Sequence, residues 1–373
     1  MHRKRKSWLA ILVPLLVITL LGGCVSTPSP SPPSGTSYPL PPGASGHIYI
    51  EFPETTKVID KPHADLLSFA YPDAPLTFSE STPWLESLAP GDVIICGRTD
   101  QTPHGLLRKV AEVTSTNGLT TVHTEEVTLE NSTKNSDIDI RGSDTATITL
   151  GEIDSSIKGV PFSLELGKVK IKYDYEFKLK IGWFNLKEFK LRLKITNVWK
   201  PGLTVGGEID LTDRTIWESS YHEIGVIEAG PIPIVIEAKF LSKLTASLLA
   251  DIALEQETDL FTSAGFEYKD GDWHFTKDWD ISTKPMNIDT EAGAEIEFTL
   301  GPKISTKILG VAGPYFWAGG LLETDFDAET KCGDFYEGIK LTAGAEAKIL
   351  SFSLGHVEFP PFEKKKELGE FCF

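Results

Sequence analysis

The residues best suited to chemistry are the cations between Leu166 and Lys200. This stretch holds ten basic and three acidic residues, a local charge of +7 in a chain of formal charge −17. Positive charge gathered on one surface attracts polyanions, such as an anionic glycan, teichoic acid or phospholipid headgroups. The candidate anion-binding residues are Lys170, Lys172, Lys178, Lys180, Lys190, Arg192 and Lys194.

A less specific interpretation stays open beside this one. Acidic side chains on adjoining strands can neutralise such lysines across a sheet. Lysines also protect exposed sheet edges from aggregation. The carboxylates considered as partners are Glu208, Asp210, Glu223 and Glu237.

A strict alternation positions these charges. Every odd position from Val169 to Ile181 is apolar, and every even position between them is charged. A period of two predicts a strand with one dry and one wet face, here roughly 43 Å long. The pattern resumes from Phe189 to Ile195, so the segment should form a long antiparallel hairpin.

The N-terminus carries a targeting pattern. A basic segment (Arg3 to Lys6) and an apolar run (Trp8 to Leu21) precede Leu21-Gly22-Gly23-Cys24. The apolar run is shorter than a membrane-spanning helix needs. This ending resembles the lipobox of prokaryotic membrane lipoproteins. The resemblance implies a signal peptide at residues 1–23, a lipidated Cys24 and a location at the extracytoplasmic face of a membrane, periplasmic or at the cell surface. An uncleaved signal anchor is the alternative, which Pro14 within the run disfavours.

The other cysteines suggest structural roles. An exported chain permits disulfides, and Cys332 with Cys372 is the preferred pair because it would tie down the C-terminus. Cys96 ends an apolar run and is predicted to be a buried thiol. As a nucleophile it would need a histidine, for which His104 and His123 are the candidates.

Motifs for metals and cofactors are incomplete. His222-Glu223 begins like a zinc-protease motif, but Val226 stands where the second histidine is needed. Asp270-Gly271 fits a hairpin turn better than a calcium loop. We therefore predict no metal, no cofactor and no enzymatic activity.

Composition narrows the class of protein. Removal of the signal peptide changes the charge from −17 to −21, which disfavours nucleic-acid binding. Residues 24–46 hold Cys24 and a Pro/Ser-rich stretch that predicts a disordered, extended linker of up to roughly 70 Å.

Two folded parts should follow this linker. We predict a small β-domain at 47–131, a linker at 132–144 and a long-stranded antiparallel β-domain at 145–373. Asn117-Gly118 is a strong hairpin signal in the first part. The segments from Gly91 to Val110 and from Leu309 to Tyr315 resemble parts of secreted, β-rich prokaryotic proteins of uncharacterised function. That resemblance implies no activity.

The expected fold is all-β and mainly antiparallel, a long-stranded β-sandwich or flattened barrel. Residues 232–254 fit both a strand and a helix, and neighbouring strands favour the strand. The lipobox and linker disfavour a transmembrane β-barrel. We expect a membrane-anchored lipoprotein with a non-catalytic binding or structural role at the cell envelope. The alternatives are an amphiphile carrier using the apolar strand faces and an envelope hydrolase with an unrecognised site.

Overall fold

The computed structural model describes residues 35–69, 74–199, 201–248, 252–255, 258–283, 287–290, 294–327, 329–330, 332–346 and 356–372. The chain divides into two units, Met1–Ser34 and Gly35–Phe373, and all described residues belong to the second. The signal peptide, Cys24 and the first part of the predicted linker lie outside the described residues.

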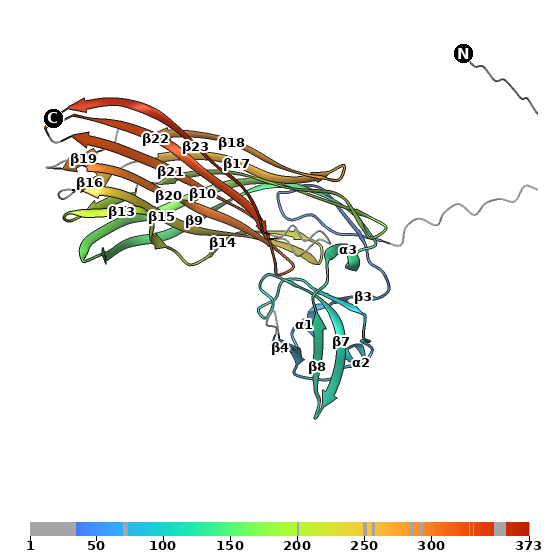
Figure 1. The fold of residues 1–373 in the computed structure, drawn as a ribbon. Helices are drawn as coiled ribbons and strands as arrows, with labels where there is room; N and C mark the ends of the chain where they lie inside the picture. The colour runs from blue at the N-terminus through green and yellow to red at the C-terminus, as the bar shows by residue number, and fades with distance from the viewer. Residues whose placement is uncertain are drawn as a thin grey trace, which may run out of the picture. The chain divides into compact units, whose positions relative to one another are not determined.

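The described strands form three sheets (Figure 1). The first sheet has the order β1 (Thr36–Ser37), β2 (Ser45–Glu51), β9 (Asn135–Ile157), β10 (Val160–Gly182), β11 (Asn185–Trp199), β17 (Thr258–Lys269) and β18 (Asp272–Thr283). Three short strands extend it beside β10, namely β12 (Gly202–Val205), β16 (Ile252–Glu255) and β19 (Asn287–Thr290).

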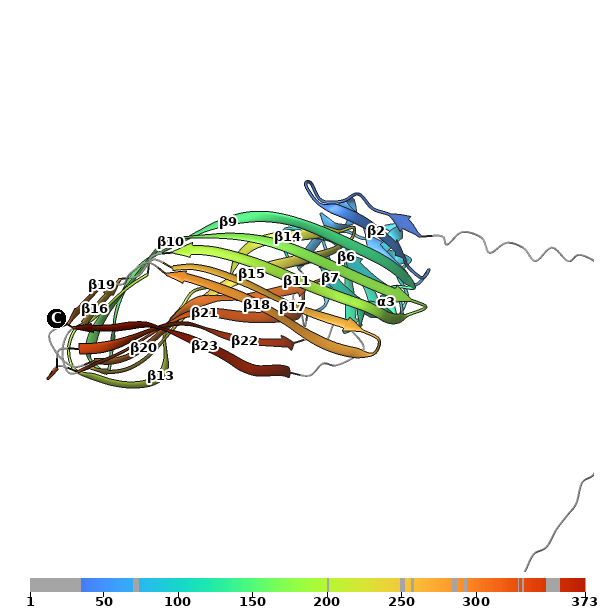
Figure 2. The ribbon, with the colours of Figure 1, turned by 90° about the horizontal axis from the view of Figure 1, so that it is seen from above.

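The second sheet faces the first. Its order is β13 (Ile209–Glu218), β15 (Ile232–Leu248), β20 (Ala294–Ile308), β21 (Val311–Asp327), β22 (Cys332–Glu346) and β23 (His356–Cys372), and β14 (His222–Ala229) also pairs with β15. No described strand pairs with strands of both sheets, so the body is a sandwich of two sheets. Figure 2 shows the long strands of the first sheet side by side in one layer.

The alternation in the sequence explains this packing. On β10, the apolar residues from Val169 to Ile181 are buried, apart from the half-buried Tyr175, and their charged neighbours face outward. Both sheets contribute to one core cluster. Tyr173 of β10 also donates a hydrogen bond to the carbonyl of Ile224 on β14, at 3.0 Å. A Cβ at Gly225 would overlap this hydroxyl, so the contact requires glycine there.

The third sheet is smaller and has the order β3 (Thr56–Ile59), β6 (Val93–Cys96), β7 (Leu106–Thr116), β8 (Leu119–Glu125), β5 (Leu76–Phe78) and β4 (Leu67–Phe69). The pair β3–β6 is parallel and the others are antiparallel. Helices α1 (Lys61–Ala64) and α2 (Pro83–Glu86) begin at the capping side chains of Asp60 and Thr82. A separate core cluster lies within this part.

The boundaries between the folded parts differ from the sequence prediction at both predicted linkers. The predicted linker at 132–144 holds the end of α3 (Leu129–Ser132) and the first part of β9, and β9 pairs with β2. Residues 35–46 belong to the sandwich too, because β1 pairs with β2 and Tyr38 packs against its core. Strand pairing between distant segments therefore places both stretches in the body.

The turns follow the sequence signals closely. Asn117-Gly118 and Asp270-Gly271 both have positive φ at each residue and close tight hairpins, as predicted. Residues 232–248 form the strand β15, as the strand interpretation of 232–254 predicts, but 252–254 belong to β16 in the first sheet, so the segment is not one continuous strand.

Candidate functional site

The basic hairpin consists of β10 and β11, and its charges fall into two groups. Near the hairpin turn the lysines have carboxylate partners, which β9 and β10 supply. Lys178 lies 3.3 Å from Asp139, Lys180 lies 3.8 Å from Asp137, and Lys190 lies 2.9 Å from Glu176. Arg192 donates to the hydroxyl of Ser263 on β17 at 3.0 Å. Cross-strand pairing thus neutralises Lys178, Lys180 and Lys190, whereas the hydroxyl bonded to Arg192 leaves its charge in place.

Of the acidic partners considered from the sequence, the carboxylates of Glu223 and Glu237 are engaged elsewhere, whereas Glu208 and Asp210 are exposed. Glu223 pairs with Arg98, and Glu237 pairs with Lys307. Asp210 accepts a bond from Lys158 through its backbone carbonyl. The neutralising carboxylates are instead those directly across the strands, which only the register of β9 against β10 identifies.

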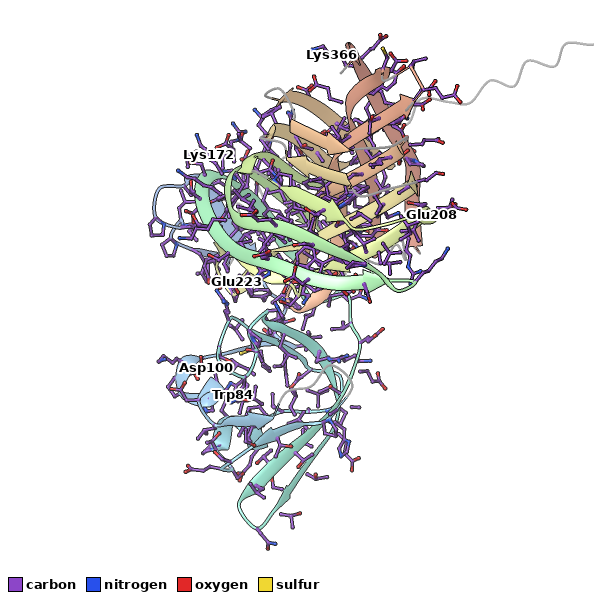
Figure 3. All side chains as sticks on the ribbon, turned by 90° about the vertical axis from the view of Figure 1, so that its left-hand side faces the viewer. Trp84, Asp100, Lys172, Glu208, Glu223 and Lys366 are labelled. Atoms are coloured by element: carbon purple, nitrogen blue, oxygen red, sulfur yellow. The ribbon has the colours of Figure 1, made fainter. Side chains whose placement is uncertain are left out.

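The other end of the hairpin is different. Lys168, Lys170 and Lys172 of β10 and Lys194 of β11 are exposed on the outer face, and none of them forms an ion pair within the described residues. We call these four residues the basic patch. Figure 3 shows Lys172 on the outer surface of the body. Their cross-strand neighbours on the same face include the exposed hydroxyl residues Thr145, Thr147 and Thr196, along with Asp174 opposite Lys194.

Neither Cys96 nor Cys332 has the contacts of a reactive thiol in the structure as described. Cys96 is buried and free, and burial raises the pKa of its thiol. In the described part of the chain its sulfur accepts a hydrogen bond from Thr102 at 3.7 Å, whereas His104 contacts Glu237 and Lys307. Cys332 is disulfide-bonded, and the register of β22 and β23 places Cys372 directly opposite it.

An ion cluster joins the small sheet to the sandwich. His104 Nε2 lies 2.9 Å from Glu237 Oε1, and Lys307 Nζ lies 3.0 Å from Glu237 Oε2. Arg98 of the small sheet's β6–β7 loop also pairs with Glu223 on β14 at 2.5 Å. Glu237 is nearly buried and contacts both His104 of the small sheet's loop and the Lys307 ammonium, so the cluster holds the two parts together.

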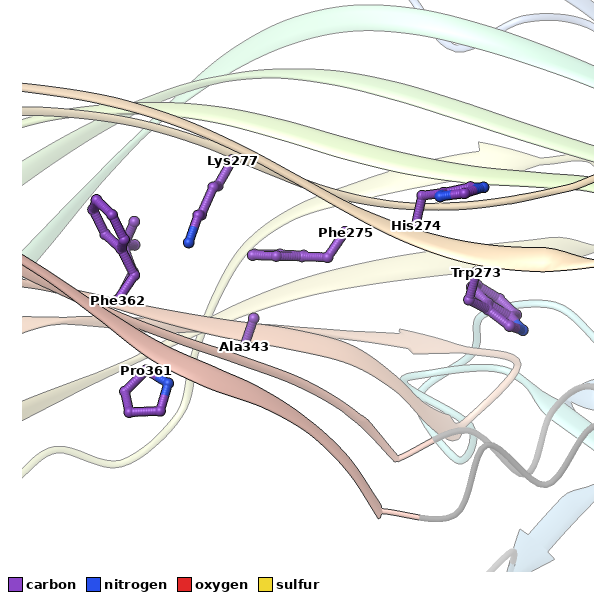
Figure 4. A pocket seen from close by; sticks show the side chains of 8 residues that line it. Trp273, His274, Phe275, Lys277, Ala343, Pro361 and Phe362 are labelled. Atoms are coloured by element: carbon purple, nitrogen blue, oxygen red, sulfur yellow. The ribbon is translucent and has the colours of Figure 1, made fainter.

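A groove opens between the last strands of the two large sheets. It has a volume of about 420 Å³ and is lined by Trp273, His274, Phe275, Lys277, Leu341, Ala343, Pro361 and Phe362. Figure 4 shows Phe275 and Lys277 of β18 pointing toward Ala343 and Phe362 of the opposite sheet. The interior beside Leu193, Phe266 and Phe316 leaves only about 10 Å³. In the part of the chain that the structure describes, no carboxylate lines the groove.

Sequence reasoning missed this groove. The one available signal was Lys277, which interrupts the apolar alternation Trp273, Phe275, Trp279 on β18. Among the described residues, no cluster of histidine, cysteine and acidic side chains has the geometry of a metal site. Within the same residues, no helix has the length and apolar character required to cross a bilayer.

Comparisons of the chain with protein-family models, with curated proteins and with solved structures find no match.

Proposed function

We propose that the protein is a lipid-anchored lipoprotein at the extracytoplasmic face of a membrane, where it binds a polyanionic envelope polymer without catalysing a reaction. The observation that carries the binding role is the basic patch, four exposed lysines on one sheet face that form no ion pair with any residue the structure describes. The sequence Leu21-Gly22-Gly23-Cys24 supports the anchor.

The spacing of the patch suits an extended polymer. Alternate residues of one strand lie about 6.6 Å apart and neighbouring strands about 4.8 Å apart. Lys168, Lys170 and Lys172 therefore form a row along β10, with Lys194 beside it. Threonine hydroxyls across the strands add hydrogen-bond donors to the same face.

The many carboxylates elsewhere in the body oppose this attraction only weakly. The Debye length is about 8 Å at physiological ionic strength, so distant carboxylates are largely screened there and the nearby lysines act locally. Lysines near the hairpin turn contribute less, because Asp137, Asp139 and Glu176 already neutralise them.

The experiment compares two triple variants of equal charge change. Lys170, Lys172 and Lys194 become glutamine in the first, and Lys178, Lys180 and Lys190 in the second. Retention of each on immobilised heparin, a sulfated glycan, is measured across a salt gradient and repeated with poly(glycerol phosphate). We expect the first variant to elute at much lower salt and the second to stay close to the wild type.

Two results would contradict the proposal. Equal loss of retention in both variants would mean that bulk charge alone controls binding. A wild type that ignores both polymers yet binds anionic phospholipid vesicles through the same lysines would make a membrane surface the partner instead.

A further inference from the structure

The groove lies where the sandwich is open at one side. β18 ends the first sheet and β23 ends the second, and both contribute lining residues together with β22. Aromatic and aliphatic side chains line both sides, with Trp273 and Phe275 on one side and Leu341, Ala343 and Phe362 on the other, and His274 and Lys277 add polar surface. The aromatic and aliphatic side chains of this wall favour contact with hydrocarbon over water, beside a positive charge.

Lys277 occupies a position that the alternation assigns to the core. It lies on the same face of β18 as Trp273 and Phe275, and its partner across the strands is Ala264, which is buried. Its Nζ stands 4.0 Å from the centre of the Phe362 ring. The described residues supply no carboxylate partner for this ammonium group, so an unneutralised cation stands beside the aromatic residues of the groove.

Edge protection is the simplest explanation of such a lysine. An inward-pointing charge on an edge strand discourages association with other chains. The neighbouring edge β23 is protected by other means, since it carries Pro361 and the run from Lys364 to Lys366. Protection of an edge accounts for a charge, but it does not require an apolar hollow of about 420 Å³ beside that charge.

We propose that this groove binds a single-chain amphiphile with an anionic headgroup, such as a free fatty acid. The hydrocarbon chain lies against Phe275, Ala343 and Phe362, and the carboxylate pairs with Lys277. The volume falls in the range of about 300–1,000 Å³ that is usual for small-molecule sites. The nearly filled space beside Phe266 keeps the ligand at the open side. This site is separate from the basic patch and goes beyond the polymer-binding function.

Quenching of tryptophan fluorescence tests the location. The protein used is the chain from residue 24 onward with Cys24→Ser, so that no attached acyl chain competes. Palmitate brominated in mid-chain is the probe, because bromine quenches an indole only on contact. We expect saturable quenching that falls in Trp273→Phe, and weaker binding in Ala343→Leu, whose larger side chain fills the groove.

The headgroup is tested with matched ligands and variants. Lys277→Gln should weaken binding of the brominated fatty acid about tenfold, the size expected of one charged hydrogen bond. Binding of the corresponding brominated alcohol should stay unchanged. Lys303→Gln is the control, since Lys303 also stands over a ring, that of Tyr315 at 4.2 Å, but lies outside the groove.

Three outcomes would overturn the inference. The first is no saturable quenching of the wild type by the fatty acid, and the second is quenching of equal depth in Trp273→Phe. The third is equal affinity of the wild type for the acid and the alcohol. Lys277→Gln changes an exposed residue, so a folded variant is expected, and matching thermal unfolding curves check this.

Discussion

Replacing Asn197 with valine should stabilise the protein. Asn197 lies on β11 and faces the interior, opposite Ile171 of β10. It is fully buried, and neither its amide nitrogen nor its amide oxygen has a hydrogen-bond partner in the structure as described. The folded state therefore leaves two polar atoms without hydrogen bonds, whereas water solvates both atoms in the unfolded chain.

The magnitude follows from the two unsatisfied atoms. Each buried donor or acceptor without a partner costs about 1–3 kcal/mol. Valine removes both atoms and favours strands, but its different shape brings packing strain of about 1–3 kcal/mol. We expect a net gain of roughly 2 kcal/mol. For a unit of this length the unfolding entropy is about 0.7 kcal/mol per degree, so Tm should rise by roughly 3 °C.

Asn135 provides a matched control on β9 of the same sheet. Its amide donates to Glu51 at 2.6 Å and accepts from the backbone of Trp183 at 3.1 Å. The bonds from Lys134 and Asn135 hold the pKa of the Glu51 carboxyl below its usual value. Asn135→Val removes one of these bonds from a nearly buried carboxylate, so Tm should fall.

Thermal unfolding of both variants followed by circular dichroism decides the question. Opposite shifts are the expected result. If Asn197→Val lowers Tm as much as Asn135→Val, the Asn197 amide has partners in the folded protein, internal water being the obvious one, and the reasoning fails.

Three further predictions concern other parts of the chain. Burial raises the pKa of the Glu337 carboxyl, and Lys366 at 3.5 Å acts against this shift. The stability that the protonated carboxyl contributes is therefore present below its unfolded pKa and is lost as pH rises through its folded pKa. Glu337→Gln should therefore raise Tm at pH 7 and change it little at pH 4; equal shifts at both would contradict this. If Cys332 bonds to Cys372, which the register favours, Cys332→Ser should destabilise the fold by about 4 kcal/mol, and non-reducing digestion should release both cysteines in one linked peptide. Cys24→Ala should move the protein out of the detergent-extracted lipoprotein fraction, and unchanged partitioning with an uncleaved N-terminus would indicate a signal anchor.

Local patterns were sufficient to predict several of the strands. The alternation from Val169 to Ile181 identified which side chains of β10 are buried, and the Asn-Gly and Asp-Gly pairs located two hairpin turns. Both signals lie within a few residues of sequence, because side-chain direction in a strand and backbone strain in a tight turn are local properties. The ambiguous segment at 232–248 needed its neighbours, since apolar residues there fit two periods.

The sequence did not predict which distant segments pair with one another. β2 pairs with β9 although the strands of the small sheet lie between them in the sequence, and this pairing places the predicted linker in the body. The same register decided which lysines face carboxylates and which remain exposed as the basic patch.

The sequence by itself determined the class of fold, the wet and dry faces of the long strands and the proposed anchor at Cys24. Only the tertiary structure decided how charges pair across strands and where the sandwich stays open beside Lys277. The physical reason is that a strand's pattern specifies which face must be buried, whereas the partner that buries it depends on the packing of the whole chain.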